Sequence, residues 1–133
     1  MKLYSEKVLV AWGEAISGNT EIRDWLLKNN YPELALFCHA LYFDEKSSNW
    51  LFKNHPHLLA LIKAVEGNNK ARIFLNKKFP KLYTISLAAD GDVVKMNFLI
   101  KNDPLFAVIA NKIKLVKDDI DEINNDIHKW GFS

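Results

Sequence analysis

The chain has 133 residues, of which 49% are hydrophobic, 26% charged and 12% aromatic. This composition suits one globular domain with a substantial core, and it excludes a disordered chain, which does not carry so many aromatic residues. A formal net charge of only +2 excludes the strong global basic field that nucleic-acid-binding domains usually present.

The cellular compartment is constrained by three features. The single cysteine, Cys38, rules out an intramolecular disulfide and fits a reducing environment. The first seven residues become charged before an apolar segment can form, so no signal peptide is expected. No uncharged apolar run approaches the roughly 18 residues that a membrane span requires. We therefore expect a cytoplasmic protein with no membrane segment.

The first predicted element is a helix within residues 5–18. It has no proline, but Ala15 and the Gly18-Asn19 pair stand at the same offsets from Trp25 as Ala64 and Gly67-Asn68 do from Phe74. We interpret this segment as half of a unit that recurs along the chain.

A repeat of 24 residues follows, marked by four prolines at that interval. An aromatic-Leu pair precedes each proline, and an alanine and a short turn sequence follow each of the first three. One extra residue lies in the turn at 29–31. The prolines are Pro32, Pro56, Pro80 and Pro104, and the aromatic-Leu pairs are Trp25-Leu26, Trp50-Leu51, Phe74-Leu75 and Phe98-Leu99. The recurring alanines are Ala40, Ala64 and Ala88, and the turn sequences are Phe43-Asp44, Gly67-Asn68 and Gly91-Asp92. Each of these sets of equivalent residues forms one column of the repeat. They predict repeats at 20–43, 44–67, 68–91 and 92–115.

Each repeat predicts a pair of short antiparallel helices. Proline suits the first turn of a helix, because the N–H that it lacks would have no partner there. Gly91 supplies the left-handed residue that ends a helix, and Asp92 suits the N-cap of the next one. No segment alternates with a period of two, so no strand is expected. A lone pair cannot bury its apolar face, whereas stacked pairs can, which predicts an all-α fold, an α-solenoid of about four repeats.

Two further structural predictions concern the core and the C-terminus. The recurring aromatic residues Trp25, Trp50, Phe74 and Phe98 are expected in the core, so that truncating one to Ala should cost about 3–5 kcal/mol. Residues 118–130 form a predicted amphipathic helix with a polar outer face, which would cap the array and keep its end in water. Asp118 or Asp119 is its expected N-cap.

The sequence from Pro80 to Asp92, PKLYTISLAADGD, resembles the first helix of an ankyrin repeat, which opens with Thr-Pro-Leu-His and closes with Ala-Ala-x-x-Gly. The following segment, VVKMNFL at 93–99, resembles the second ankyrin helix. The resemblance covers about residues 5–114. The unit is shorter than the roughly 33 residues of ankyrin repeats and would lack most of their projecting β-hairpin. Ankyrin-like arrays imply partner binding, usually of another protein, and no shared active site.

Each turn between an aromatic-Leu helix and the next proline carries a lysine, so a stacked array would place a ladder of lysines along one edge. One interpretation is helix-dipole complementation, since cations suit helix C-termini and the opposite edge is rich in Asp, Glu and Asn. The other is a basic rim that binds phosphates of nucleic acid. The ladder consists of Lys28, Lys53, Lys77 and Lys101.

Catalytic and metal-binding patterns are not evident. The close pair His55 and His57 has no Cys, Asp or Glu placed to complete a tetrahedral zinc site. Cys38 and His39 are neighbours on a predicted helix and therefore do not face each other, which favours a packing role for Cys38. The chain has no dinucleotide-binding, P-loop or nucleophile-elbow motif. We expect no enzymatic activity, no cofactor and no bound metal.

The candidate recognition surface is a stripe on the proline-started helices, one, four and seven residues after each proline. The residues of this stripe vary between repeats, whereas the core columns are constant. Such variation is typical of a recognition surface, but it is equally typical of a surface that is under no constraint. We predict a non-enzymatic module that presents this stripe to another protein; the alternative is a nucleic-acid-binding repeat protein that uses the lysine ladder. The candidate partner-binding residues are Glu33, His39, His57, Lys63, Lys81 and Thr84.

Overall fold

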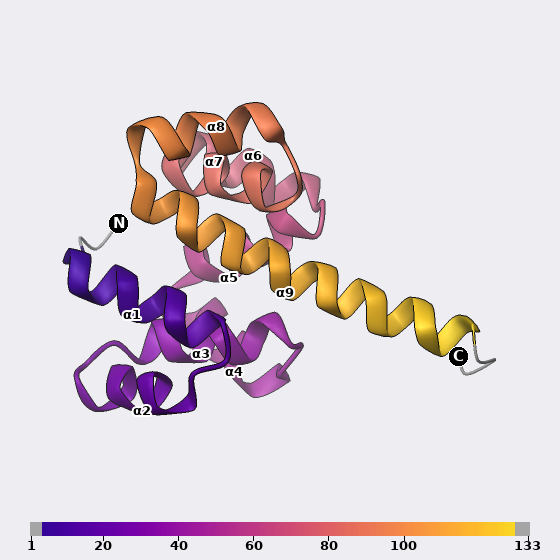
Figure 1. Ribbon diagram of the computed structural model, residues 1–133. Helices are drawn as coiled ribbons and strands as arrows, with labels where there is room; N and C mark the ends of the chain where they lie inside the picture. The colour runs from indigo at the N-terminus through magenta and orange to yellow at the C-terminus, as the bar shows by residue number, and fades with distance from the viewer. Residues whose placement is uncertain (1–3, 130–133) are drawn as a thin grey trace.

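The computed structural model describes the backbone of residues 4–129 and the side chains of residues 4–125. Within this range the chain forms nine consecutive α-helices and no strand, which confirms the predicted all-α class (Figure 1). The helices are α1 (Glu6–Ile16), α2 (Thr20–Lys28), α3 (Pro32–Leu41), α4 (Glu45–Asn54), α5 (Pro56–Val65), α6 (Asn69–Lys78), α7 (Pro80–Ala89), α8 (Val93–Asn102) and α9 (Pro104–Lys129).

The helices begin where the sequence pattern places their starts. Each of α3, α5, α7 and α9 begins at a proline. Each of α2, α4, α6 and α8 begins after a polar N-cap whose side-chain oxygen accepts a hydrogen bond from the backbone N–H three residues later. These bonds satisfy amides that have no partner within the helix. The four N-caps are Asn19, Asp44, Asn68 and Asp92.

The ends of α1, α5 and α7 are formed by glycines in the left-handed backbone region. Gly18, Gly67 and Gly91 have φ values of 105°, 93° and 104°. At the end of α3 the same position holds Phe43, with a φ of 66°. A residue with a Cβ costs about 1–2 kcal/mol in this conformation. Phe43 therefore occupies a strained position that glycine fills at the ends of α1, α5 and α7.

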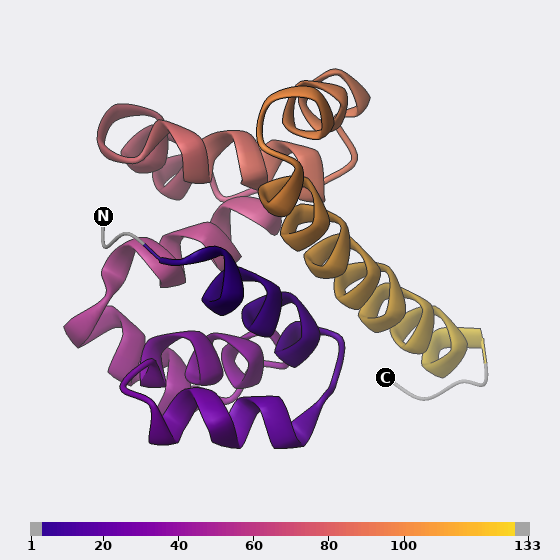
Figure 2. The same ribbon diagram turned by 60° about the vertical axis from the view of Figure 1, so that its left-hand side comes forward.

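An inner layer of helices holds the core. Its members are α1 and the four proline-started helices, and α9 packs against α1 as well as α7, so the first and last inner helices meet (Figures 1 and 2). A Cβ placed on Gly13 of α1 would lie 3.9 Å from Val108 Cγ1 of α9. The array is thus closed by contact between its two ends, so all five inner helices border one common interior.

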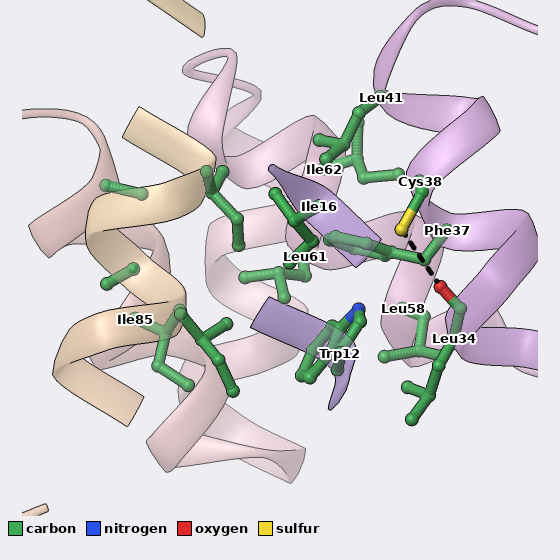
Figure 3. Close-up of a cluster of buried hydrophobic side chains, with 14 of the residues drawn as sticks. Trp12, Ile16, Leu34, Phe37, Cys38, Leu41, Leu58, Leu61, Ile62 and Ile85 are labelled. Carbon is green, nitrogen blue, oxygen red and sulfur yellow. Dashed lines mark hydrogen bonds between the residues drawn. The ribbon is translucent and has the colours of Figure 1, made fainter. Parts of the chain in front are cut away.

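One column of large side chains fills this interior (Figure 3). The residues five positions after each proline, together with the matching residue of α1, are at most 1% exposed. The rings of Trp12 and Phe37 meet edge to face, with their centroids 5.1 Å apart. The column consists of Trp12, Phe37, Leu61, Ile85 and Ile109.

The outer helices bury leucine and not the neighbouring aromatic residue. Leu26, Leu51, Leu75 and Leu99 are at most 1% exposed. The expected aromatic core column is wrong for Phe74 and Phe98, which are 37% and 53% exposed, whereas Trp25 and Trp50 are half-buried and pack against the core. Adjacent residues on a helix point about 100° apart, and each outer helix packs inward along one narrow stripe, which the leucine occupies.

The separate capping helix expected at 118–130 is wrong over residues 118–129; residue 130 lies outside the described residues. α9 runs without interruption for 26 residues from Pro104, so Asp118 and Asp119 lie inside a helix and cap nothing. The position that holds Gly67 and Gly91 in earlier repeats is Leu115 here. With neither glycine nor proline to end it, the helix continues, and its second half extends beyond the packed body (Figure 2).

Candidate functional site

The four ladder lysines lie where the sequence placed them. Each is exposed, and each belongs to the last turn of its helix. This location is the one in which a cation complements the helix dipole. The lysines therefore have a structural role that needs no ligand.

The stripe predicted for partner binding is not a continuous free surface. The residue after one proline contacts the residue before the next proline at three successive junctions. Glu33 Oε2 lies 3.5 Å from His55 Nε2, and Glu33 is only 2% exposed. The ring of His57 stacks on that of Phe79 with centroids 5.0 Å apart.

At the third junction, the residue after Pro80 again contacts the residue before the next proline, here through an ion pair. Lys81 Nζ lies 3.3 Å from Asp103 Oδ1 and 5.1 Å from the ring centroid of Phe106. The residue directly after each proline thus differs from repeat to repeat, and the residue before the next proline, which it contacts, differs with it. Packing between repeats explains the variation at the position directly after each proline, and the assignment of Glu33 to a solvent-facing surface is wrong because its side chain is buried.

The other three candidates lie outside these junctions. His39 and Lys63 are exposed, and Lys63 Nζ lies 3.8 Å from Glu66 Oε2. Thr84 is half-buried, and its hydroxyl donates to the Pro80 carbonyl oxygen at 3.1 Å. The six candidates are therefore not brought together into one site.

His57 has the most perturbed titration among the candidate residues. Burial, together with the smaller effect of the neighbouring His55, lowers its pKa to about 4. The neutral imidazole is therefore the form that the junction accommodates; its ring stacks on Phe79 and meets the ring of His55 edge to face.

The free energy of unfolding should fall as the pH drops from about 6.5 to about 4. In this window an unfolded chain protonates His57 while the folded chain does not, so acid favours unfolding. For a half-buried group we expect a loss of about 1–2 kcal/mol. Urea denaturation at several pH values measures this effect. His57→Phe, which keeps an aromatic ring on Phe79, should flatten the profile, and His39→Gln should not. An unchanged profile in His57→Phe would contradict the assignment.

Cys38 has the surroundings of a packing residue. Its side chain is 1% exposed, and its thiol donates to the Leu34 carbonyl oxygen at 3.4 Å (Figure 3). Burial raises the pKa of the thiol to about 12. A thiol held in its neutral form is a poor nucleophile.

An apolar groove, which the sequence analysis missed, lies at the point where α9 leaves the body. It encloses about 170 Å³, less than the ~300 Å³ at which sites for small-molecule ligands begin, so it suits individual side chains. Its walls come from the end of α3, from α5 and from α9. The lining residues are Leu41, Phe43, Ile62, Val65, Glu66, Ile113, Val116, Lys117, Ile120 and Asp121.

Phe43 stands out among the lining residues because two unfavourable features meet there. Its backbone is in the left-handed region, and its side chain is 64% exposed. Neither feature helps the fold. Strained residues that persist in a structure often serve a function. A sequence signal for this position existed, since Phe43 takes the place that Gly18, Gly67 and Gly91 hold in three other copies.

Comparisons with known proteins identify no relative: no protein-family model, curated protein or solved structure matches this chain. In the part of the chain that the structure describes, no helix is both long and apolar enough to cross a bilayer. Among the same residues, no three His, Cys, Asp or Glu side chains are grouped to hold a metal ion.

Proposed function

We propose that this protein is a non-enzymatic interaction module that binds another protein. The observation that carries the proposal is the apolar groove beside α9, with the exposed Phe43 at its edge. Exposed apolar side chains around a concave surface are typical of protein-binding sites, and aromatic residues are frequent anchors in them. The groove takes the place of the stripe on the proline-started helices as the binding surface.

Two further features support the proposal. The inner helices are joined to the outer ones by short turns and closed by contact between α1 and α9, which makes a firm platform for a surface. The order of a proline-started helix, a left-handed turn and a second helix also supports the proposed ankyrin-like character of the repeat, a class of arrays that serves mainly in partner binding. The exposed lysine ladder keeps nucleic-acid binding as the alternative.

Site-specific cross-linking in the native cell tests this function. A photoreactive benzoylphenylalanine in place of Phe43 should form a covalent adduct with a distinct protein partner. The same replacement at Phe52, an equally exposed phenylalanine on α4, is the matched control and should not form that adduct.

The alternative outcomes are informative. Identical adducts from both positions, or none from either, would contradict the proposal. Adducts with nucleic acid, together with DNA or RNA binding that weakens steeply with salt and on replacement of Lys53 and Lys77, would favour the basic rim instead.

A further inference from the structure

The outer helices α6 and α8 each present one exposed face, formed by the residues ten, seven, six and three positions before the next proline. These positions are spaced i, i+3, i+4 and i+7, so their side chains lie on one side of the helix. All of these side chains are exposed, and none of them lines the groove beside α9. We call them the outer face; they are Lys70, Ile73, Phe74 and Lys77 on α6, and Val94, Asn97, Phe98 and Lys101 on α8.

The outer face is rich in apolar side chains that lie in water. Ile73, Val94 and Phe98 are 68%, 75% and 53% exposed. At the position of Phe98, the other outer helices α2 and α4 carry Trp25 and Trp50, which are half-buried. The exposure is therefore a property of α6 and α8 and not of the repeat in general. Apolar side chains gathered on a surface in this way are typical of sites that bind a protein or a membrane.

The outer face is also positively charged. Neither α6 nor α8 contains an acidic residue. Arg72 is ion-paired with Asp90, whereas no described carboxylate is paired with any lysine of the two helices. Complementation of the helix dipole explains Lys77 and Lys101, but not Lys70, which lies in the first turn of α6, where the dipole disfavours a cation. The lysines of the two helices are Lys70, Lys77, Lys78, Lys95 and Lys101.

The carboxylates nearest in sequence to the two helices do not reverse this charge. Asp92 is the N-cap of α8, where its side chain accepts a hydrogen bond from the Lys95 backbone N–H at 3.0 Å. It lies at the opposite end of the helix from Lys101. The other three are held in ion pairs, which are Glu66 with Lys63, Asp90 with Arg72 and Lys117, and Asp103 with Lys81.

The combination of lysine with exposed aliphatic side chains distinguishes between possible occupants. Protein interfaces are depleted in lysine. Single-stranded nucleic acid binds through its phosphates and by stacking on aromatic rings, and Ile73 and Val94 have no ring to offer. An anionic bilayer attracts lysines and also accepts apolar side chains of any shape at the boundary between its headgroups and acyl chains. Charge and apolar content together therefore favour an anionic membrane surface.

The two helices are placed so that one surface can meet both. α6 and α8 lie at the same end of the molecule, with α7 packed against each of them (Figures 1 and 2). α2 lies at the other end (Figure 1). There Glu21 and Asp24 take the positions of Lys70 and Ile73. The same scaffold thus carries acidic groups at the end that is remote from the outer face.

We propose that the outer face of α6 and α8 binds the anionic surface of a lipid bilayer. This contact is separate from the groove beside α9 and does not depend on it. Ile73, Val94 and Phe98 would enter the boundary between headgroups and acyl chains. The lysines would keep their ammonium groups at the anionic headgroups while their methylene groups lie deeper. A peripheral contact of this kind needs no helix that crosses the bilayer.

Co-sedimentation of the full chain with lipid vesicles tests the proposal. One set of vesicles contains phosphatidylcholine alone, and the other contains about 30% phosphatidylserine in addition. We expect the chain to bind the phosphatidylserine vesicles at least about tenfold more tightly, and we expect high salt to weaken this binding because it screens the lysines.

Two double variants and a matched control locate the surface. Lys77→Gln with Lys101→Gln, and Ile73→Ser with Phe98→Ser, should each weaken binding to phosphatidylserine vesicles by at least about tenfold. The control, Leu27→Ser with Lys28→Gln, makes the same kinds of change on α2, where Leu27 is 44% exposed, and should leave binding unchanged. Thermal unfolding of all three should match that of the parent chain, since every replaced side chain is exposed.

Several results would overturn the inference. These are equal affinity for the two kinds of vesicle, no binding of the phosphatidylserine vesicles, or an equal effect of the α2 control. A loss of binding in the lysine variant with none in the Ile73→Ser and Phe98→Ser variant would also contradict a bilayer. If a labelled single-stranded oligonucleotide binds more tightly than the vesicles and responds to the lysine variant, the surface belongs to nucleic acid.

Discussion

Phe37→Ala is expected to lower the free energy of unfolding by about 3–5 kcal/mol. Phe37 is fully buried, and its ring packs edge to face on Trp12 with centroids 5.1 Å apart. Truncation removes this contact and leaves a cavity in the interior that all five inner helices share. Because α9 packs on α1, the surrounding helices are held on both sides and can collapse only partly into the space.

Equilibrium denaturation in urea, followed by tryptophan fluorescence and by circular dichroism, measures this loss. Phe52→Ala is the matched control, since it makes the same chemical change at a side chain that is 69% exposed. It should alter stability by less than about 0.5 kcal/mol. Equal losses in the two variants would contradict the placement of the central column.

Leu75→Ala is the second change with a large expected effect, a loss of about 2–5 kcal/mol. Leu75 is fully buried where α6 packs against α5 and α7. Its neighbour Phe74 is 37% exposed, and Phe74→Ala should cost clearly less, in spite of the larger side chain removed. Thermal and urea unfolding of the two variants under the same conditions give the comparison.

This pair of variants decides which of two adjacent columns holds the outer helices in place. A larger loss for Phe74→Ala than for Leu75→Ala would restore the aromatic core expected from the repeat pattern. Leu51→Ala and Phe52→Ala on α4 provide a second, independent pair with the same geometry, since Leu51 is fully buried and Phe52 is exposed.

Local signals in the sequence are strong in this protein because helix ends depend on few residues. Proline at a first turn, Asn or Asp at an N-cap and Gly at a left-handed end each act within about four residues. The bounds of α5, α6, α7 and α8 follow directly from them. The same logic explains the error at α9, where the absence of a glycine at Leu115 was the informative signal.

The candidate site was harder to predict, since its residues are far apart in the chain. Phe43, Val65 and Ile120 line one groove, yet no local pattern relates them. At the first position of the variable stripe the variation has a structural cause: Glu33, His57 and Lys81 differ because each matches a partner in the next repeat. Such pairing becomes visible only when the repeats are stacked.

The sequence by itself determined the order of the helices and the residues at which α2 to α9 begin, because the 24-residue period and the helix-end residues are local properties of the chain. Tertiary structure alone decided that α1 meets α9, that each outer helix buries its leucine more deeply than the aromatic residue beside it, and that a groove opens beside Phe43. The physical reason is that these three features depend on the angle at which successive helix pairs stack. No single turn specifies this angle, because the packing of all five inner helices sets it.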